Sequence, residues 1–326
     1  MGAGTAAVIV NWNAGAYLGR CVDALLGQTL PLARIVVVDN ASSDGSLEGI
    51  AARSERVELV RLDRNQGFAA ATNVGIRRAA EAEWIALINP DVFPRPDWLE
   101  KLLAPAERHP EYSFFASLQL DANDPTRLDG AGDVYSVNGL AWRRFHGAPL
   151  QATPLGAPEE VFGPCAAAAL YRREVFSDVG GLDESFFCYF EDVDLAFRLR
   201  LAGHRCLFVP DAVALHVGSA VTGRRSEFTT YYGHRNLVWC WFKNMPAPLA
   251  AAYLSQHLLL NLLSGLWYAR RGQGRTLLRA KRDALRGLPP VLRARRHVQA
   301  RRRVGSRALR AQMASGRTAF GRWRSA

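Results

Sequence analysis

The first ninety residues alternate short aliphatic runs with helical patterns, and few folds accept this alternation. Ala6–Val10 and Ile35–Val38 are apolar runs of strand length, and Ala16–Leu26 between them has the apolar spacing of a helix. Two strands joined through a helix form a β-α-β unit, whose strands lie parallel. The pattern repeats, because Leu59–Leu62 is typical of a third strand and Asn73–Ala82 of a second helix.

A fourth strand is predicted at Trp84–Ile88, where Asn89 and Pro90 end it. Strands that alternate with helices indicate a doubly wound α/β fold, in which helices flank a mainly parallel sheet. From residue 113 to residue 161 the pattern weakens into Gly, Pro and short β segments. The fold of that segment is less defined by its sequence.

Polar side chains follow three of the predicted strands. Asn11 and Asn13 follow the first strand, Asp39 follows the second, and Asn89 and Asp91 follow the fourth. Ligands of open α/β sheets bind beyond the carboxyl ends of the strands. One such polar segment alone would indicate only a turn, but three at one edge predict a binding site.

Residues 186–194 place three carboxylates directly after aromatic and thiol side chains. An ionised acid is costly to bury unless it is paired, hydrogen-bonded or metal-bound, so Glu191, Asp192 and Asp194 suggest a site. The alternative is a helix start, because acids favour the first turn, and a helical pattern follows at 195–201. We interpret Asp194 and Arg198 as a structural i,i+4 pair.

Cysteine usage and the N-terminus indicate a reducing compartment. The cysteines form no CxxC pair and no zinc spacing, so we expect buried free thiols; they are Cys21, Cys165, Cys188, Cys206 and Cys240. The chain shows no basic segment followed by an apolar stretch of secretory-signal length. We therefore expect the folded part to stay in the cytosol.

Basic charge is concentrated at the C-terminus. Residues 270–326 hold 18 of the 41 Lys and Arg but one acid, so this tail is +17 and the rest of the +11 chain is −6. A basic tail on an acidic globule indicates a polyanionic partner, either anionic lipid or nucleic acid. Arg293–Arg303 would suit phosphates of either, but no base-reading module accompanies it. A disordered tail without a partner is the third alternative.

The segment before the tail is apolar. Asn244–Ala269 contains no Lys, Arg, Asp or Glu and is long enough to cross a bilayer. Prolines and polar residues interrupt it, so we favour an in-plane interfacial helix or hairpin over a spanning or buried helix. We therefore expect a domain at 1–245 and a helical, membrane-associated extension at 246–326, whose basic residues bind anionic headgroups.

Six motifs together resemble those of family-2 inverting glycosyltransferases with the GT-A fold, in the bacterial rhamnosyltransferase-like branch. The resemblance covers about residues 6–245 and lies in the order and spacing of the motifs. They are VIVNWN (8–13), VVVDNASSDGS (36–46), NQGFAAATNVGIR (65–77), LINPDV (87–92), GGLDESFFCYFEDVDLAFRLRLAG (180–203) and His216.

The resemblance implies a nucleotide-sugar donor at the strand ends, where Asn11 and Asn13 lie. Asp39 would accept from the base-ring N–H of a pyrimidine nucleotide. Asn73 and Arg77 would lie near the nucleotide or diphosphate.

The resemblance also implies that Arg235 contacts the donor or a lipid diphosphate, and that Asn89 hydrogen-bonds the ribose. Each assignment has a structural alternative: a turn cap for Asp39, a helix cap for Asn73 and a surface cation for Arg235.

The metal motif departs from the family's Asp-x-Asp, because Asn89 stands where the first Asp is expected. Asp91 would supply the hard oxygen ligand that Mn²⁺ or Mg²⁺ needs beside diphosphate. His216 follows the strand-like run Ala212–Leu215 and resembles the His that completes the metal site in relatives. Imidazole would favour Mn²⁺ over Mg²⁺, although a lone His is more often structural.

Sugar transfer also needs a base for the acceptor hydroxyl. The resemblance favours Asp192, with Glu191 next. It implies a dTDP- or UDP-sugar donor, dTDP-rhamnose first, and a lipid-linked saccharide acceptor of the cell envelope. We expect an enzyme peripherally attached to the cytoplasmic membrane, and nucleic acid is not expected as a partner. The alternatives are a nucleotidyltransferase, whose Gly-rich basic loop is missing from residues 11–19, and a non-catalytic basic scaffold or RNA-binding protein.

Overall fold

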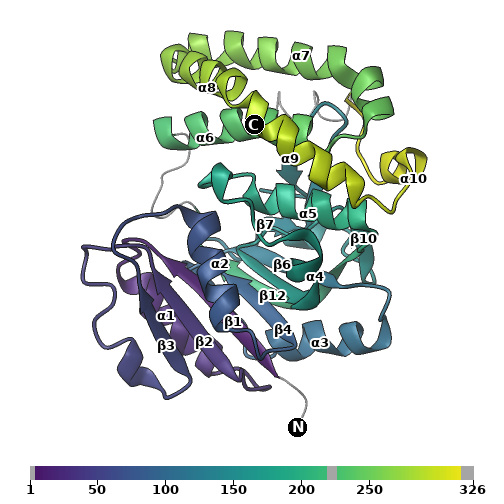
Figure 1. The fold of residues 1–326 in the computed structure, drawn as a ribbon. Coiled ribbons are helices and arrows are strands. Elements are labelled where there is room, and N and C mark those ends of the chain that lie inside the picture. The colour runs from purple at the N-terminus through teal and green to yellow at the C-terminus, as the bar shows by residue number, and fades with distance from the viewer. Residues whose placement is uncertain (1–3, 219–225, 317–326) are drawn as a thin grey trace.

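The computed structural model describes residues 4–218 and 226–316. One ten-stranded mixed sheet has the order β10-β12-β6-β11-β4-β1-β2-β3, with β5 paired to β12 and β7 to β6 (Figure 1). Its strands are β1 (Thr5–Asn11), β2 (Arg34–Asp39), β3 (Val57–Arg61), β4 (Trp84–Ile88), β5 (Val92–Pro94), β6 (Phe114–Asp121), β7 (Leu128–Ala131), β10 (Glu159–Val161), β11 (Ala168–Arg172) and β12 (Cys206–His216). A separate hairpin pairs β8 (Asp133–Tyr135) with β9 (Ala141–Arg143).

The N-terminal half of the sheet is parallel, as the alternating pattern predicts. β1 pairs in parallel with β2 and β4, and β2 with β3. Helix α1 (Ala16–Leu26) and strand β4 have the predicted bounds. The register sets Asn11 opposite Asp39 at the carboxyl edge, so the polar strand ends do converge.

The structure shifts the second predicted helix and defines a strand where the sequence pattern was weak. Helix α2 spans Phe68–Arg78 and not Asn73–Ala82, because Gly67, at φ 88°, turns the chain directly into the helix. Within the weakly patterned segment, β6 is an eight-residue central strand between β12 and β11. Its seven leading residues are buried, so both of its faces are covered and no polar alternation marks it.

Helices cover both faces of the sheet. Helices α1 and α3 (Trp98–Arg108) share one apolar core with the sheet, and α2, α4 (Glu174–Val179) and α5 (Glu191–Ala202) share the other. Single 3-10 turns occur at η1 (Ala51–Arg53), η2 (Leu150–Ala152) and η3 (Glu184–Phe186). This is the predicted α/β layering.

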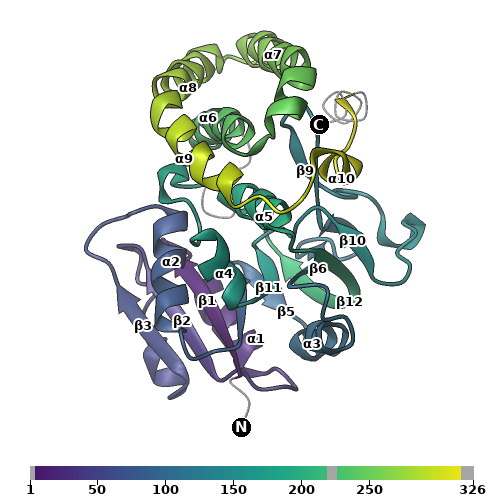
Figure 2. The same cartoon turned by 45° about the vertical axis from the view of Figure 1, so that its right-hand side comes forward.

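The C-terminal part is a layer of helices over the carboxyl edge of the parallel strands (Figures 1 and 2). Its helices are α6 (Glu227–Asn244), α7 (Ala247–Arg270), α8 (Gly274–Arg286), α9 (Leu288–Ala300) and α10 (Ser306–Ala311). The basic tail is thus folded up to residue 316, which contradicts the alternative of a disordered tail over that range. Its last three arginines, at 317, 322 and 324, lie outside the described residues.

Candidate active site

A pocket of about 240 Å³ lies at the carboxyl edge of the sheet, beneath α6. The ends of β4 and β12 contribute Asn89, Asp91 and His216, and the first turn of α5 contributes Glu191 and Asp192. Asp91 precedes Glu191 by 100 residues and His216 follows Asp192 by 24, and the fold brings all four to a single cavity. Aromatic side chains complete the wall: Trp12, Phe68, Phe187, Tyr189, Phe190 and Phe228.

His216 lies between two carboxylates. Its Nε2 is 3.5 Å from Asp91 Oδ1, and its Nδ1 is 2.7 Å from Asp129 Oδ2. We assign the Nδ1 proton to the shorter bond with Asp129, which leaves the Nε2 lone pair toward Asp91. A carboxylate behind the imidazole is the usual way to orient a metal-binding His. The geometry thus fits a divalent ion at Asp91 and His216.

Asp129, on β7, belongs to no sequence motif, so the sequence did not predict its contact with His216. Its side chain is 2% exposed and also pairs with Arg143 and His146. Burial acts against ionisation of Asp129, but the hydrogen bonds from His146 and His216 and the charge of Arg143 hold its pKa well below the usual range. In the part of the chain that the structure describes, no group of three or more His, Cys, Asp or Glu side chains could hold an ion. Diphosphate oxygens would have to complete the coordination.

The two adjacent acids of the motif differ in their partners. Asp192 accepts from the backbone N–H of Val193 at 2.8 Å and of Ala166 at 3.3 Å. Glu191 is 6% exposed, and its buried Oε2 has no hydrogen-bond partner. Burial, and next the charge of Asp192, raise the pKa of Glu191 well above its usual value. Burial also raises the pKa of Asp192, while the two N–H groups oppose that rise, so Asp192 is the more readily ionised.

The loop before these acids is strained and held from α6. Phe187, Tyr189 and Phe190 all have φ between 65° and 68°, a region that costs side-chain-bearing residues about 1–3 kcal/mol each. The amide nitrogen of Asn236, fully buried in α6, lies 2.7–2.9 Å from the carbonyl oxygens of Phe186, Cys188 and Tyr189. Asn236 therefore fixes the entry into α5, a role its sequence context did not reveal.

Arg235 also holds the loop before α5. Its Nη2 donates to the carbonyl oxygens of Ser185 and Phe186 at 3.0 and 2.9 Å, and its guanidinium lies 4.1 Å from the Trp239 ring centroid. Arg235 does not line the pocket of Asp91 and Asp192. Its expected contact with a diphosphate stays a prediction.

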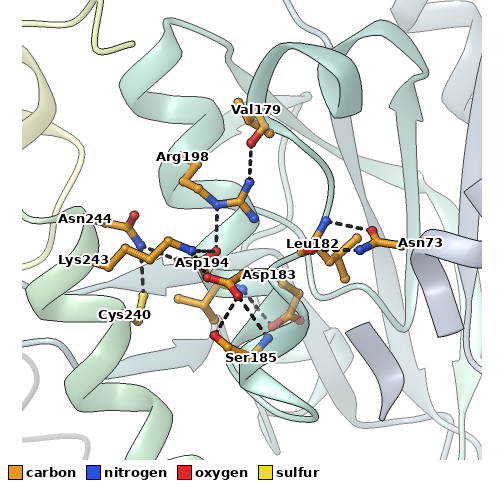
Figure 3. Close-up of polar contacts among 12 residues, drawn as sticks. Asn73, Val179, Leu182, Asp183, Ser185, Asp194, Arg198, Cys240, Lys243 and Asn244 are labelled. Atoms are coloured by element: carbon orange, nitrogen blue, oxygen red, sulfur yellow. Dashed lines mark hydrogen bonds and ion pairs between the residues drawn. The ribbon is translucent and has the colours of Figure 1, made fainter. Parts of the chain in front are cut away.

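Behind α5, a buried ionic network joins that helix to α6 and η3 (Figure 3). Asp194 accepts from Arg198 at 2.7 Å and Lys243 at 2.9 Å, as the i,i+4 interpretation of Asp194 and Arg198 predicts. Lys243 also binds Asp183 at 2.5 Å, and Asn244 donates to Asp194 at 2.8 Å. The network holds α5 to α6 and to the start of η3.

The expected nucleotide residues fall into two places. Asn11 donates to Asp39 at 3.0 Å, and Asp39 accepts from the Ser42 hydroxyl at 2.5 Å. Asn13, at φ 52°, accepts from the Ser43 N–H at 2.8 Å. These residues shape the loop beside the pocket, although their side chains do not line it.

Asn73 and Arg77 lie elsewhere. Asn73 exchanges two 2.9 Å hydrogen bonds with the backbone of Leu182 (Figure 3). Both residues line a second cavity of about 720 Å³ between α2, α4 and α9. The structure does not bring them to Asp91, and their donor role stays a prediction.

The five cysteines are free thiols. Cys21, Cys206 and Cys240 are buried as expected, whereas Cys165 and Cys188 are partly exposed and line the pocket. The expectation of five buried thiols is therefore wrong for these two, because both stand in loops at the sheet edge and not in the core.

The fold and this site define a glycosyltransferase of the GT-A type. Residues 6–180 match the model of glycosyl transferase family 2, and the chain belongs to that family. Among its relatives is the N-acetylglucosaminyl-diphospho-decaprenol L-rhamnosyltransferase of Mycobacterium tuberculosis (strain H37Rv), 30% identical over 239 residues, which are 67% of this chain and 77% of the relative. The succinoglycan biosynthesis protein ExoO of Rhizobium meliloti is 34% identical over 148 residues, 45% of this chain and 38% of that protein.

Solved structures agree in fold. GalNAc-T7 with UDP, GalNAc and Mn²⁺ superposes with a TM-score of 0.60 at 19% identity, over 73% of this chain and 47% of that chain. The mannosyltransferase PcManGT from Pyrobaculum calidifontis, with GDP-Man and Mn²⁺, has a TM-score of 0.54 at 18% identity, over 94% of this chain and 83% of that one. The predicted GT-A architecture is confirmed.

Proposed function

We propose that the enzyme is an inverting rhamnosyltransferase that moves rhamnose from dTDP-rhamnose to a lipid-linked saccharide in cell-envelope polysaccharide synthesis. The observation that carries the chemistry is one cavity lined by Asp91 and His216 on one side and Glu191 and Asp192 on the other. The rhamnosyl donor and the lipid-linked acceptor are supported by the M. tuberculosis relative, whose name states both the sugar and a diphospho-decaprenol acceptor.

In this mechanism Asp192 takes the proton of the acceptor hydroxyl. The acceptor oxygen then attacks the anomeric carbon, the bond from that carbon to the diphosphate breaks, and the configuration inverts. Burial raises the pKa of Asp192, and its two backbone donors oppose that rise and favour the ionised form, which can act as the base. Glu191, whose burial favours the neutral form, would donate a hydrogen bond to acceptor or sugar.

Asp91 and the Nε2 atom of His216 would hold Mn²⁺ or Mg²⁺, and Asp129 would orient His216. When bound, the ion supplies Lewis-acid stabilisation of the departing diphosphate. Asn89, whose buried Oδ1 has no hydrogen-bond partner, would accept from a donor hydroxyl in the same pocket.

The enzyme would act on the cytoplasmic side of the membrane, as a peripheral protein whose basic C-terminal part binds anionic headgroups. The proposed units are the transferase domain, 1–245, and the helical extension, 246–326. Among the described helices, α7 is the one long and apolar enough to span a bilayer, and 22% of its apolar window is buried.

A donor screen tests the proposal. Nucleotide sugars would be compared by thermal stabilisation with Mn²⁺ and with chelator, because a ligand at a hundred times its Kd stabilises by about 2.7 kcal/mol. We expect dTDP-rhamnose to stabilise most and only with the metal. NMR of the product should show the inverted anomeric configuration. A larger thermal stabilisation by another nucleotide sugar would reassign the donor. Retention of the anomeric configuration in the product would exclude the proposed inverting displacement.

A further inference from the structure

Helix α7 presents a stripe of leucines to solvent. Its buried residues, Leu249, His257, Leu260 and Ser264, recur at helical spacing and define the face that packs on the protein. Five leucines are 39–63% exposed: Leu254, Leu258, Leu259, Leu262 and Leu266. At 100° per residue these leucines centre on the side opposite the buried face. The outer face of α7 is thus apolar along about three turns.

The inner face of α7 is tied to the catalytic domain. His257 Nδ1 lies 2.8 Å from the carbonyl oxygen of Asn138, and its ring stacks on Trp241 at 4.3 Å between centroids. A polar, packed inner face cannot be given up to lipid without loss of these contacts. The helix therefore suits a position along a surface, and not across a bilayer.

Helix α8 lies beside α7 and adds cations to leucines. Leu278 and Leu285 are 72% and 63% exposed. Arg275 and Arg282 fall on the same stripe at helical spacing, opposite the buried Thr276, Leu277, Ala280 and Ala284. Both views show α7 and α8 as the outermost helices, on the far side of α6 from the sheet (Figures 1 and 2).

We propose that the outer faces of α7 and α8 form one docking surface for an anionic bilayer, with the leucines at the level of the headgroups and acyl chains. This deepens the proposed function by naming the surface that meets the membrane. Apolar side chains beside cations match the two attractions of such an interface, burial of apolar area and attraction to anionic lipid. Asp283 is the one acid between residues 270 and 326, so the charge of α8 complements the bilayer.

Two basic residues of the 293–303 segment are engaged with the domain. Arg295 donates to the carbonyl oxygens of Phe242 and Met245, and Arg303 pairs with Asp178 at 3.3 Å. These arginines of the 293–303 segment hold α9 and the chain after it to the domain. On α8, by contrast, the exposed Arg275 and Arg282 stand beside exposed leucines, and cations next to apolar side chains favour lipid over RNA. Arg282 also pairs with Asp283 at 3.0 Å, a surface pair that contributes little.

The docking surface also places the active site. Helix α6 underlies α7 and α8. It carries Asn236, which holds the loop before α5, and the pocket residue Phe228. A bilayer against α7 and α8 would thus lie one helix layer from the pocket. An acceptor anchored in that bilayer would present its saccharide at this level.

Vesicle flotation of the full-length protein tests this surface. The double variant Leu258→Glu/Leu262→Glu should lower binding to phosphatidylglycerol-containing vesicles by about tenfold or more, because each leucine side chain loses its burial. The double variant Arg275→Gln/Arg282→Gln should bind less and depend less on the anionic-lipid fraction and on salt. The matched control is Leu30→Glu, since Leu30 is 40% exposed but lies in the α1–β2 loop; its binding should match the parent's.

Flotation needs no substrate, so its outcome is independent of the donor screen. Equal flotation of parent and Leu258→Glu/Leu262→Glu would overturn the proposal. So would light scattering that shows a parent dimer and a monomeric double variant with no lipid binding by either, since a second copy would then cover the leucines. The circular dichroism spectra and melting temperatures of the variants should match the parent's, which shows that they are folded.

Discussion

Removal of the Asp194 charge should destabilise the enzyme strongly. Asp194 is fully buried and accepts from Arg198, Lys243 and Asn244 at 2.7–2.9 Å. In Asp194→Asn the side-chain shape remains, but of the two buried cations, 4% and 6% exposed, Lys243 keeps Asp183 as an acidic partner and Arg198 keeps only the Val179 carbonyl oxygen. Loss of one member of a buried ionic pair leaves an uncompensated charge and costs about 3–5 kcal/mol. We expect a loss of that size.

The measurement is equilibrium unfolding in urea, followed by circular dichroism, with the same substitution at an exposed pair as control. Asp124 and Arg127 are 48% and 54% exposed and 3.3 Å apart, so Asp124→Asn should leave the urea midpoint nearly unchanged. Lys243→Met in the Asp194→Asn background should recover part of the loss, because it removes the uncompensated cation. A cost below about 1 kcal/mol for Asp194→Asn, or no coupling to Lys243, would refute this account of the network.

Three further predictions concern the base, the metal site and a buried lysine. Asp192→Asn should lower the transfer rate about 10²- to 10⁴-fold with donor affinity nearly unchanged. Single-turnover kinetics measures the rate and calorimetry the affinity. A larger loss of rate in Glu191→Gln would assign the role of base to Glu191. Asp129→Asn should weaken Mn²⁺ binding in the presence of dTDP about 10- to 100-fold by electron paramagnetic resonance, and unchanged affinity would remove Asp129 from the site. Burial lowers the pKa of Lys281 to about 7, so the unfolded chain binds more protons above that pH. Stability should rise between about pH 7 and pH 10 by at most about 1.4 kcal/mol per unit, and Lys281→Met should abolish that slope in urea titrations.

Local patterns predicted the parallel half of the sheet well. Each of β1, β2, β3 and β4 is predicted by a short apolar run, and helices α1 and α2 separate β1 from β2 and β3 from β4. The central position of β6 could not be read in this way. Its neighbours β11 and β12 come about 50 and 90 residues later in the chain, and strand order depends on tertiary packing, which no local spacing encodes.

The site residues likewise divide into those that local sequence patterns predict and those that they do not. Asp91, His216, Glu191 and Asp192 stand at a strand end or a helix start, so the general rule for open α/β sheets brings them together. Asp129 and His216 are 87 residues apart in the sequence. No local sequence pattern predicts their hydrogen bond. Second-layer residues of this kind are visible only once the fold has placed the first layer.

Helix α6 connects the loop before α5 to the proposed membrane surface. Three non-glycine residues with positive φ in one short loop would be costly to hold alone, and Asn236 offsets that cost with hydrogen bonds to carbonyl oxygens of the loop. The same helix packs against α8 through the Trp239 N–H, 2.9 Å from the Ala284 carbonyl oxygen. The start of α5, and with it the pocket acids Glu191 and Asp192, is therefore positioned by a helix whose other side supports the proposed membrane surface. A displacement of α8 at the bilayer would reach the pocket through α6, which carries Asn236 and the pocket residue Phe228.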